Sequence, residues 1–269
     1  MPSNKIISLT NPNIKRIVQL RDRTKRKETD LTIIEGAREV LCACAAKVKL
    51  TEIYFCPAIL KNPEIKQAMV QAQEEGAKLF EVNQDVWGKI SYGERQEGVL
   101  AVGEPKLVTL NDLKLKSNSF LLVVEHLEKP GNLGAILRTC EAGGVGAVII
   151  CDQLTDPYNP NVIRASLGAV FSVPVVVASN EATKDFLCKK KITVYAATPQ
   201  AQNVYTKCDF TGSLAIVVGN EEQGLTDFWM NAADQQVKIP MAGKIDSLNV
   251  SVTAALVIYE VIRQRDIPQ

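Results

Sequence analysis

The sequence predicts an α/β protein with two domains, and three observations along its 269 residues predict it. Short apolar segments alternate with segments of helical periodicity. In the second half the apolar segments are almost unbroken runs of β-branched residues, which is typical of parallel strands covered on both faces. A polar, lysine-containing stretch between about residues 104 and 117 separates the halves. We therefore expect a small α/β domain over residues 1–104 and a larger domain with a mostly parallel sheet over 117–269.

The first domain begins with a helix whose start is marked in the sequence. Asn11 is suited to cap it, and Pro12 is suited to the first helical position. After this helix the apolar and helical patterns alternate. We expect strands over residues 31–34, 52–56, 78–82 and 98–102, and helices over 37–48, 63–75 and 83–90.

Positive charge is concentrated at the beginning of the chain. Residues 1–30 hold eight Lys or Arg and three Asp or Glu, whereas the whole chain has a formal net charge of only +1. Any binding to nucleic acid must therefore come from a local patch. Two interpretations stay open: a solvated helix end, or a phosphate-contacting patch. The candidate phosphate contacts are Arg23, Lys25, Arg26 and Lys27.

The second domain has longer and more apolar strands. We expect strands over residues 119–125, 147–151, 173–178, 193–197 and 214–219, and helices over 133–142, 161–170, 181–190 and 248–264.

Composition excludes several classes of protein. No apolar run approaches the roughly 18–20 residues that span a bilayer, and the N-terminus has no apolar signal segment, so we expect a cytoplasmic protein with no membrane contact. The seven cysteines are scattered, which favours reduced, buried thiols. With no Cys-x-x-Cys pair and a single histidine, we expect no metal site.

Three segments of the second half carry polar residues within or next to apolar stretches, at positions where packing of a hydrophobic core alone would not require them. In the first, Asn132 is placed to cap a helix, and Arg138 follows inside an otherwise apolar stretch. In the second, a buried strand ends in Gly219-Asn-Glu221, at the edge where α/β folds bind ligands. In the third, Ser247 and Asn249 precede a very apolar helix. Each segment also has a purely structural explanation. Arg138 could pack its aliphatic stem on the surface, residues 219–221 could be an ordinary strand end, and Ser247 or Asn249 could simply cap the helix.

Other chemistries lack their motifs. The glycines over residues 143–146 follow a helix and precede a strand, whereas a dinucleotide-binding loop needs the reverse order. No Gly-Lys-Ser/Thr and no Gly-x-Ser-x-Gly sequence occurs, and His126 is the single histidine. Nicotinamide redox chemistry, nucleotide hydrolysis and triad hydrolysis are therefore disfavoured.

The three segments, taken together and in order, resemble the three motifs of the SpoU (TrmH-like) class of SPOUT RNA methyltransferases. The resemblance covers roughly residues 119–265 and includes residues 164–168 and 173–175. The N-terminal part resembles the small ribosomal-protein-like RNA-binding domain that precedes this catalytic domain in many members. The chain departs from the family at Lys129, where members commonly have an acidic residue.

The resemblance implies a specific activity and architecture. Members transfer a methyl group from S-adenosylmethionine to a ribose 2′-hydroxyl in RNA. Their SPOUT domain is an α/β fold with a deep trefoil knot, an exception to the rule that chains are not knotted, and they are homodimers with the active site near the subunit interface. Residue by residue, the resemblance implies catalytic roles for Asn132, Arg138, Glu221, Ser247 and Asn249, and cofactor contacts for Gly219, Ile239, Met241 and Leu248.

The expected substrate is a structured RNA. Because a separate α/β domain with a basic segment precedes the catalytic domain, 23S ribosomal RNA is favoured over transfer RNA. The alternatives are a tRNA 2′-O-methyltransferase, an antibiotic-resistance methyltransferase acting on the ribosome, and a catalytically silent RNA-binding protein with the same fold. Since a guanidinium is always protonated, Arg138 suits a bidentate clamp on phosphate better than a general base.

Overall fold

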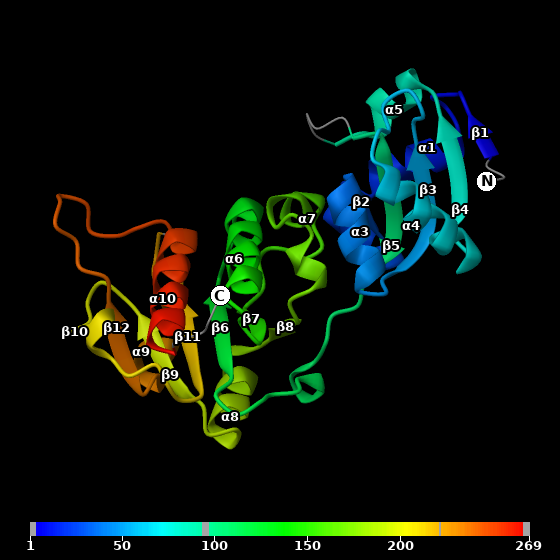
Figure 1. Cartoon of the computed structure of the whole chain (residues 1–269). Coiled ribbons are helices and arrows are strands. Elements are labelled where there is room, and N and C mark those ends of the chain that lie inside the picture. The colour runs from blue at the N-terminus through cyan, green and yellow to red at the C-terminus, as the bar shows by residue number, and fades with distance from the viewer. Residues whose placement is uncertain (1–3, 93–96, 221, 266–269) are drawn as a thin grey trace. The chain divides into compact units, whose positions relative to one another are not determined.

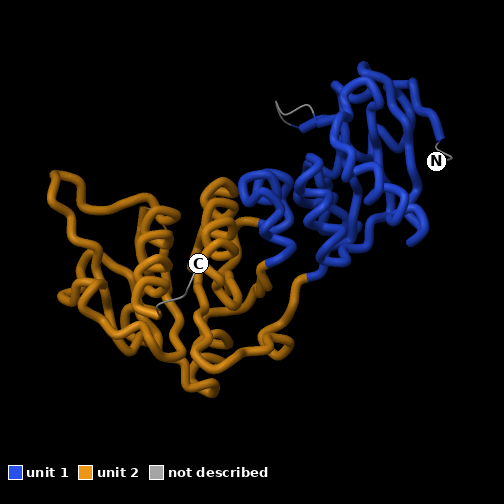
Figure 2. The backbone as a smooth tube through the Cα atoms, viewed as in Figure 1, with its two compact units in different colours: residues 1–106, 156–172 blue, residues 107–155, 173–269 orange. Residues whose placement is uncertain are grey.

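The computed structural model describes residues 4–92, 97–220 and 222–265, and the chain divides into two compact units. Figure 2 colours them: the first comprises Met1–Lys106 and Asp156–Ser172, and the second comprises Leu107–Thr155 and Val173–Gln269. No helix in the described part of the chain combines the length and apolarity needed to cross a bilayer.

The first unit contains a five-stranded mixed sheet (Figure 1). The strand order is β1-β4-β3-β5-β2; β1 and β3 run parallel to β4, whereas β5 runs antiparallel to β3 and β2. In chain order the elements are β1 (Asn4–Ile6), α1 (Pro12–Gln19), α2 (Arg23–Thr29), β2 (Thr32–Glu35), α3 (Ala37–Ala45), β3 (Lys49–Phe55), α4 (Pro63–Glu74), β4 (Lys78–Val82), α5 (Gln84–Ile90) and β5 (Val99–Glu104), followed by α7 (Pro160–Ala165) and the 3-10 helix η2 (Ala169–Phe171).

Local signals account for the helix starts of this unit. The Asn11 side chain accepts a hydrogen bond from the backbone N–H of Asn13, and Pro12 occupies the first position of α1, so that prediction is confirmed. Helix α1 then turns Ile14 and Ile17 into a core shared with Trp87 of α5. Burial of these large side chains, at roughly 1.5–3 kcal/mol each, holds the helices on the sheet.

The basic segment is largely helical, because residues 23–29 form α2, a helix that the sequence pattern did not predict. Asp22 caps α2 by accepting hydrogen bonds from the backbone N–H groups of Thr24 and Lys25. Arg26 is buried, forms an ion pair with Asp156 at 2.8 Å and donates to two backbone carbonyls. The expectation of a phosphate contact is therefore wrong for Arg26, because its guanidinium is already engaged inside the unit.

Residues 156–172 pack against the first unit although they follow the second domain's first strands in sequence. Beside the Arg26–Asp156 pair, the Thr32 hydroxyl donates to the carbonyl of Tyr158 at 2.6 Å. Gly168 lies so close to Cys42 of α3 that a Cβ would meet that side chain. The expected helix over 161–170 is instead the short α7 followed by η2, since Gly168 adopts a left-handed conformation between them.

The second unit contains a seven-stranded sheet in which every pairing is parallel, as predicted for unbroken apolar strands. Its order is β10-β12-β9-β11-β6-β7-β8. The elements are the 3-10 helix η1 (Leu110–Asp112), β6 (Phe120–Glu125), α6 (Pro130–Ala142), β7 (Ala147–Cys151), β8 (Val175–Ala178), α8 (Asn180–Lys189), β9 (Thr193–Ala197), β10 (Asn203–Val204), η3 (Tyr205–Lys207), β11 (Leu214–Val218), α9 (Asp227–Ala232), β12 (Gln235–Lys238) and α10 (Val250–Gln264).

Helices cover both faces of this sheet (Figure 1). Phe186 of α8 and Trp229 of α9 share a core with inward-facing strand residues such as Val123. On the opposite face α6 and α10 lie side by side, and Gly143 at the end of α6 admits Ile258 of α10. The helices lie on the two faces of the sheet, and the carboxyl ends of its strands are where parallel α/β folds bind ligands.

Two capping expectations are corrected by the observed helix starts. Helix α6 begins at Pro130 with Lys129 at the N-cap, so Asn132 lies in the first turn instead of capping the helix. Helix α10 is capped by Asn249, whose Oδ1 accepts from the backbone N–H of Ser251, and not by Ser247. The side chains of Asn132 and Ser247 therefore do not cap these helices and make other contacts. The trefoil knot stays a prediction.

Candidate active site

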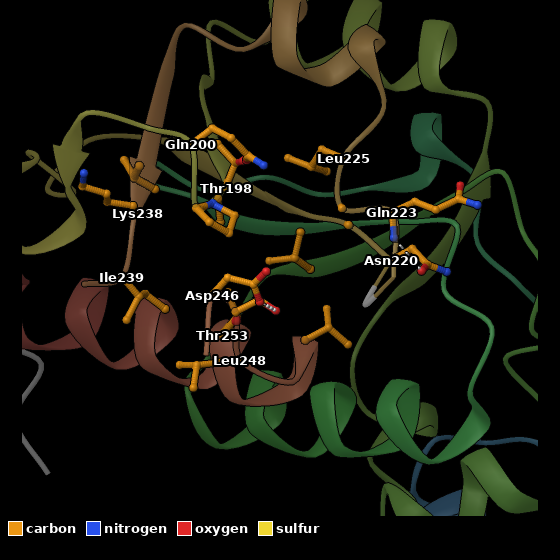
Figure 3. A pocket seen from close by; sticks show the side chains of 18 of the residues that line it. Thr198, Gln200, Asn220, Gln223, Leu225, Lys238, Ile239, Asp246, Leu248 and Thr253 are labelled. Atoms are coloured by element: carbon orange, nitrogen blue, oxygen red, sulfur yellow. Dashed lines mark hydrogen bonds between the residues drawn. The ribbon is translucent and has the colours of Figure 1, made fainter. Parts of the chain in front are cut away.

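A cavity of about 430 Å³ lies at the carboxyl ends of β9, β11 and β12. Three stretches and the first turns of α10 form its walls: residues 197–200 after β9, residues 218–220 and 222–225 after β11, and the segment that leads from β12 to α10. Figure 3 shows Gln200 and Leu225 on one side and Asp246 and Leu248 on the opposite side. Its size and its mixture of apolar and polar walls are typical of a small-molecule site.

The loop after β11 is folded tightly on itself. At Gly219 a Cβ would overlap the backbone of Gly224, so a side chain cannot be accommodated there. The backbone N–H of Gly224 donates to the carbonyl of Asn220 at 2.9 Å, and the Asn220 Oδ1 accepts from the N–H groups of Glu222 and Gln223. These bonds close the loop into a compact turn that forms one wall of the cavity.

The segment between β12 and α10 supplies the opposite wall. Four of the residues expected at the site line the cavity here: Ile239, Met241, Ser247 and Leu248. The Ser247 hydroxyl hydrogen-bonds to Asp246 at 3.1 Å. Together with Gly219, the structure therefore gathers all four expected cofactor contacts and one expected catalytic residue around one cavity.

A second group of expected residues joins α6 to α10. The Asn249 Nδ2 donates to the Asn132 Oδ1 at 3.3 Å, while the Asn249 Oδ1 caps α10. The Nδ2 of Asn132 is shielded from solvent and has no hydrogen-bond partner among the described residues. An unsatisfied buried donor is costly, so this amide is a candidate for contact with a ligand.

Arg138 does not line the cavity within the described part of the chain. Its side chain is exposed. It lies six residues after Asn132 on α6, which places the two side chains about 120° apart around the helix axis. Glu221, the remaining expected catalytic residue, lies outside the described residues.

Sequence reasoning missed one wall of the cavity. Thr198 and Gln200, which follow β9 and are hydrogen-bonded to each other, line the cavity on this side. Asp246, which precedes Ser247, lines it as well and was also not predicted. Polar residues after an apolar strand were visible in the sequence, and the rule that ligands bind at the carboxyl ends of parallel strands applies to residues 193–197 as well as to 214–219.

Another polar cluster lies at the ends of β6 and β7. Ligand atoms of Glu125, His126 and Asp152 lie within 4.8 Å of one another, an arrangement that can hold a metal ion. However, both oxygens of Glu125 already accept hydrogen bonds, from Thr226 and Asn180. These bonds explain the cluster as a polar network around the buried Glu125, and the expectation of no metal stays a prediction.

Comparison with known proteins agrees with this geometry. The model of the SpoU rRNA Methylase family matches residues 119–259, and that of the MRM3-like substrate binding domain matches residues 11–101. The 23S rRNA (guanosine-2′-O-)-methyltransferase RlmB of Pasteurella multocida is 35% identical over 229 residues, which cover 82% of this chain and 92% of that protein.

Solved structures extend the similarity to both units. An RNA 2′-O ribose methyltransferase is 38% identical with a TM-score of 0.85, covering 98% of this chain and 100% of that one. An AdoMet-bound rRNA methyltransferase from Sinorhizobium meliloti is 27% identical with a TM-score of 0.87, covering 97% and 98%. The family expectation is thereby confirmed: the chain belongs to the SpoU rRNA methylase family, with an MRM3-like substrate-binding domain before the methylase domain.

Proposed function

We propose that this protein transfers a methyl group from S-adenosylmethionine to a ribose 2′-hydroxyl of 23S ribosomal RNA. One observation carries the proposal: the cavity at the strand ends gathers Gly219 and the segment 239–248, the parts that the family resemblance assigns to the cofactor. Two relatives that match most of the chain act on ribosomal RNA by name, which favours ribosomal over transfer RNA.

The residues around the cavity fit the cofactor. Apolar side chains such as Ile239 and Leu248 offer a surface for an adenine ring, and Gly219, which has no Cβ, lets the loop close against Gly224 and form one wall of the cavity. Asp227 and Asp246 also line the cavity, and their negative charge suits a ligand that carries a sulfonium and an ammonium group. When bound, S-adenosylmethionine supplies the methyl group and the positive charge of the sulfonium.

Catalysis then depends on how the chain holds the RNA ribose. Positive sulfonium and developing negative oxygen neutralise each other in the transition state, so in-line positioning and exclusion of water favour the reaction. Arg138 holds an RNA phosphate by two parallel hydrogen bonds and stabilises the charge on the ribose oxygen. Asn132, held by Asn249, offers its unsatisfied amide N–H to the substrate. Glu221 and Ser247 complete the polar set.

A homodimer brings Arg138 to a cavity. Because Arg138 is exposed on α6 and is not among the described residues that line the cavity of its own chain, a second copy is needed to place it at a cavity. Helix α10 supports this arrangement, since Val252, Leu256 and Tyr259 form an exposed apolar stripe along it beside Ser251 and Tyr205. A contiguous apolar stripe on a helix next to a candidate active site is typical of a subunit interface.

The two domains then have separate tasks. We assign RNA binding to residues 1–104, with the exposed cations of α2 as phosphate contacts, and methyl transfer to residues 117–269. Ribosomal RNA as substrate agrees with a cytoplasmic location.

The test is methyl transfer from tritium-labelled S-adenosylmethionine to unmodified 23S rRNA, 16S rRNA and tRNA in parallel. We expect label in 23S rRNA alone, in a dinucleotide that resists alkali because its 2′-hydroxyl is blocked. Label in tRNA would support the tRNA alternative. Cofactor binding with no transfer to any RNA would support the silent protein and contradict the proposal.

A further inference from the structure

Two consecutive residues at the carboxyl end of β6 hold both ends of the loop that follows β11, whose described residues 219–220 and 222–226 are here called the cavity loop. At its beginning, the Asn220 Nδ2 donates to the backbone carbonyl of His126 at 3.0 Å. At its end, Thr226 donates its backbone N–H and its hydroxyl to the Glu125 carboxylate at 2.8 and 2.7 Å. The pair Glu125–His126, here called the β6 corner, thus fixes the loop to the centre of the sheet.

The Thr226 hydroxyl bonds to Glu125 and not to the helix that follows it. Thr226 occupies the N-cap position of α9, where a threonine side chain usually accepts from a backbone N–H of the first helical turn. Here it makes no such cap and donates to Glu125 instead. The Thr226 side chain therefore attaches the loop to Glu125 and contributes no cap to α9.

Glu125 is itself held in a fully buried network. Its side chain is inaccessible to solvent, and Asn180 of α8 donates to it at 2.9 Å. The Asn180 Oδ1 accepts in turn from the indole N–H of Trp229 at 2.5 Å. A buried carboxylate is tolerated when such bonds satisfy its oxygens, and a satisfied network is rigid. The corner therefore offers the loop a fixed reference point.

His126 contributes its backbone. Its φ of 51° lies in the left-handed region, which is uncommon for a residue other than glycine. In this conformation its N–H donates to the carbonyl of Cys151 at the end of β7, and its carbonyl faces Asn220. The contact with the loop therefore needs the turn and the carbonyl oxygen, and not the imidazole.

We infer that the β6 corner positions the cavity loop for S-adenosylmethionine, with Glu125 and Thr226 as positioning residues. This rests on the proposed function, because the loop forms one wall of the cofactor cavity. A loop held at both ends before the cofactor arrives loses less conformational freedom on binding. Breaking one attachment should therefore weaken cofactor binding without touching the RNA-binding domain.

The test compares two threonines of the second unit. Thr226→Val removes the hydroxyl that donates to Glu125, whereas Thr183→Val removes a fully buried hydroxyl of α8 that donates to the Ser179 carbonyl and not to the loop. By calorimetry, we expect Thr226→Val to raise the Kd for S-adenosylmethionine about tenfold. We expect Thr183→Val to leave it unchanged, and the Kd for RNA to stay the same in both variants.

Rescue and exchange complete the test. Thr226→Ser, which keeps both donors, and His126→Gly, which keeps the carbonyl and suits the left-handed turn, should bind the cofactor with nearly wild-type affinity. In the unliganded wild-type protein, hydrogen exchange should show the Thr226 amide strongly protected and the amide of the exposed Lys244, outside the loop, less so. That readout holds even if Thr226→Val does not fold.

Equal cofactor affinity of Thr226→Val and wild type, or a Thr226 amide that exchanges as fast as that of Lys244, would overturn the inference. A wild-type protein that binds no S-adenosylmethionine would instead overturn the proposed function, and the corner's role with it.

Discussion

Arg26 illustrates how a residue in a basic run acquires a structural role. Its guanidinium is 5% exposed and is neutralised by Asp156, which is itself partly accessible. Arg26→Ala leaves that carboxylate without its partner, so we expect the free energy of unfolding to fall by about 3 kcal/mol. Lys27→Ala, one residue further on and exposed, should change it by less than about 0.5 kcal/mol. Denaturant titration of both variants measures the difference; equal stabilities would contradict it.

The cysteines differ in reactivity for an equally local reason. Burial raises the pKa of the Cys151 thiol to about 12 and holds that of Cys140 far above its usual range. Since the thiolate is the reactive form, neither should react with iodoacetamide at pH 8 in the folded protein. The exposed Cys188 should react first. Peptide mass mapping before and after unfolding in urea checks this order, and native labelling of Cys140 would show that the core opens.

Individual elements were predictable where the local sequence and the tertiary environment agree. Strands such as β6 and β11 were expected because residues buried on both faces are apolar without interruption. Helix α5 was expected because Asn83 marks its start. By contrast, the six-residue α9 and the polar strand β12 carry too weak a local pattern. Their existence depends on partners that are distant in sequence.

The candidate site shows the same division. Gly219 and Asn249 belong to motifs that are read along the chain, so their neighbourhoods could be expected. Thr198 reaches the same cavity only because β9 pairs with β11, and strand order is not encoded in a local pattern. The role of Thr226 was hidden for the same reason, because its partner Glu125 lies 101 residues earlier.

Helix α10 carries the prediction that belongs to the element scale. Leu256 is 37% exposed on its apolar stripe, and Val70 of α4 is 38% exposed. If the stripe is the subunit interface, Leu256→Glu buries a charge there and should convert the dimer to a monomer. Val70→Glu, a control with the same exposure and charge, should leave the mass unchanged. Light scattering coupled to gel filtration measures both, and a wild-type monomer would contradict the dimer.

For the whole molecule, the near balance of charge, with a formal net charge of +1, means that attraction to RNA must be local. With Arg26 engaged internally, the exposed cations of α2 are Arg23, Lys25 and Lys27. Replacing these three by Ala removes up to three phosphate contacts. The slope of log K against log salt for RNA binding should therefore become less steep by about two, at roughly 0.7 per contact.

The matched control replaces Lys61, Lys66 and Lys78, which are three exposed lysines elsewhere in the first unit. That variant has the same net charge as the α2 variant. If binding depended on overall charge alone, both variants would show the same slope between 50 and 200 mM salt, a range over which phosphate contacts are clearly resolved. We expect only the α2 variant to lose salt dependence, with cofactor affinity unchanged in both. An unaltered slope in the α2 variant would remove this helix from the RNA-binding surface and leave the solvated helix end as its correct interpretation.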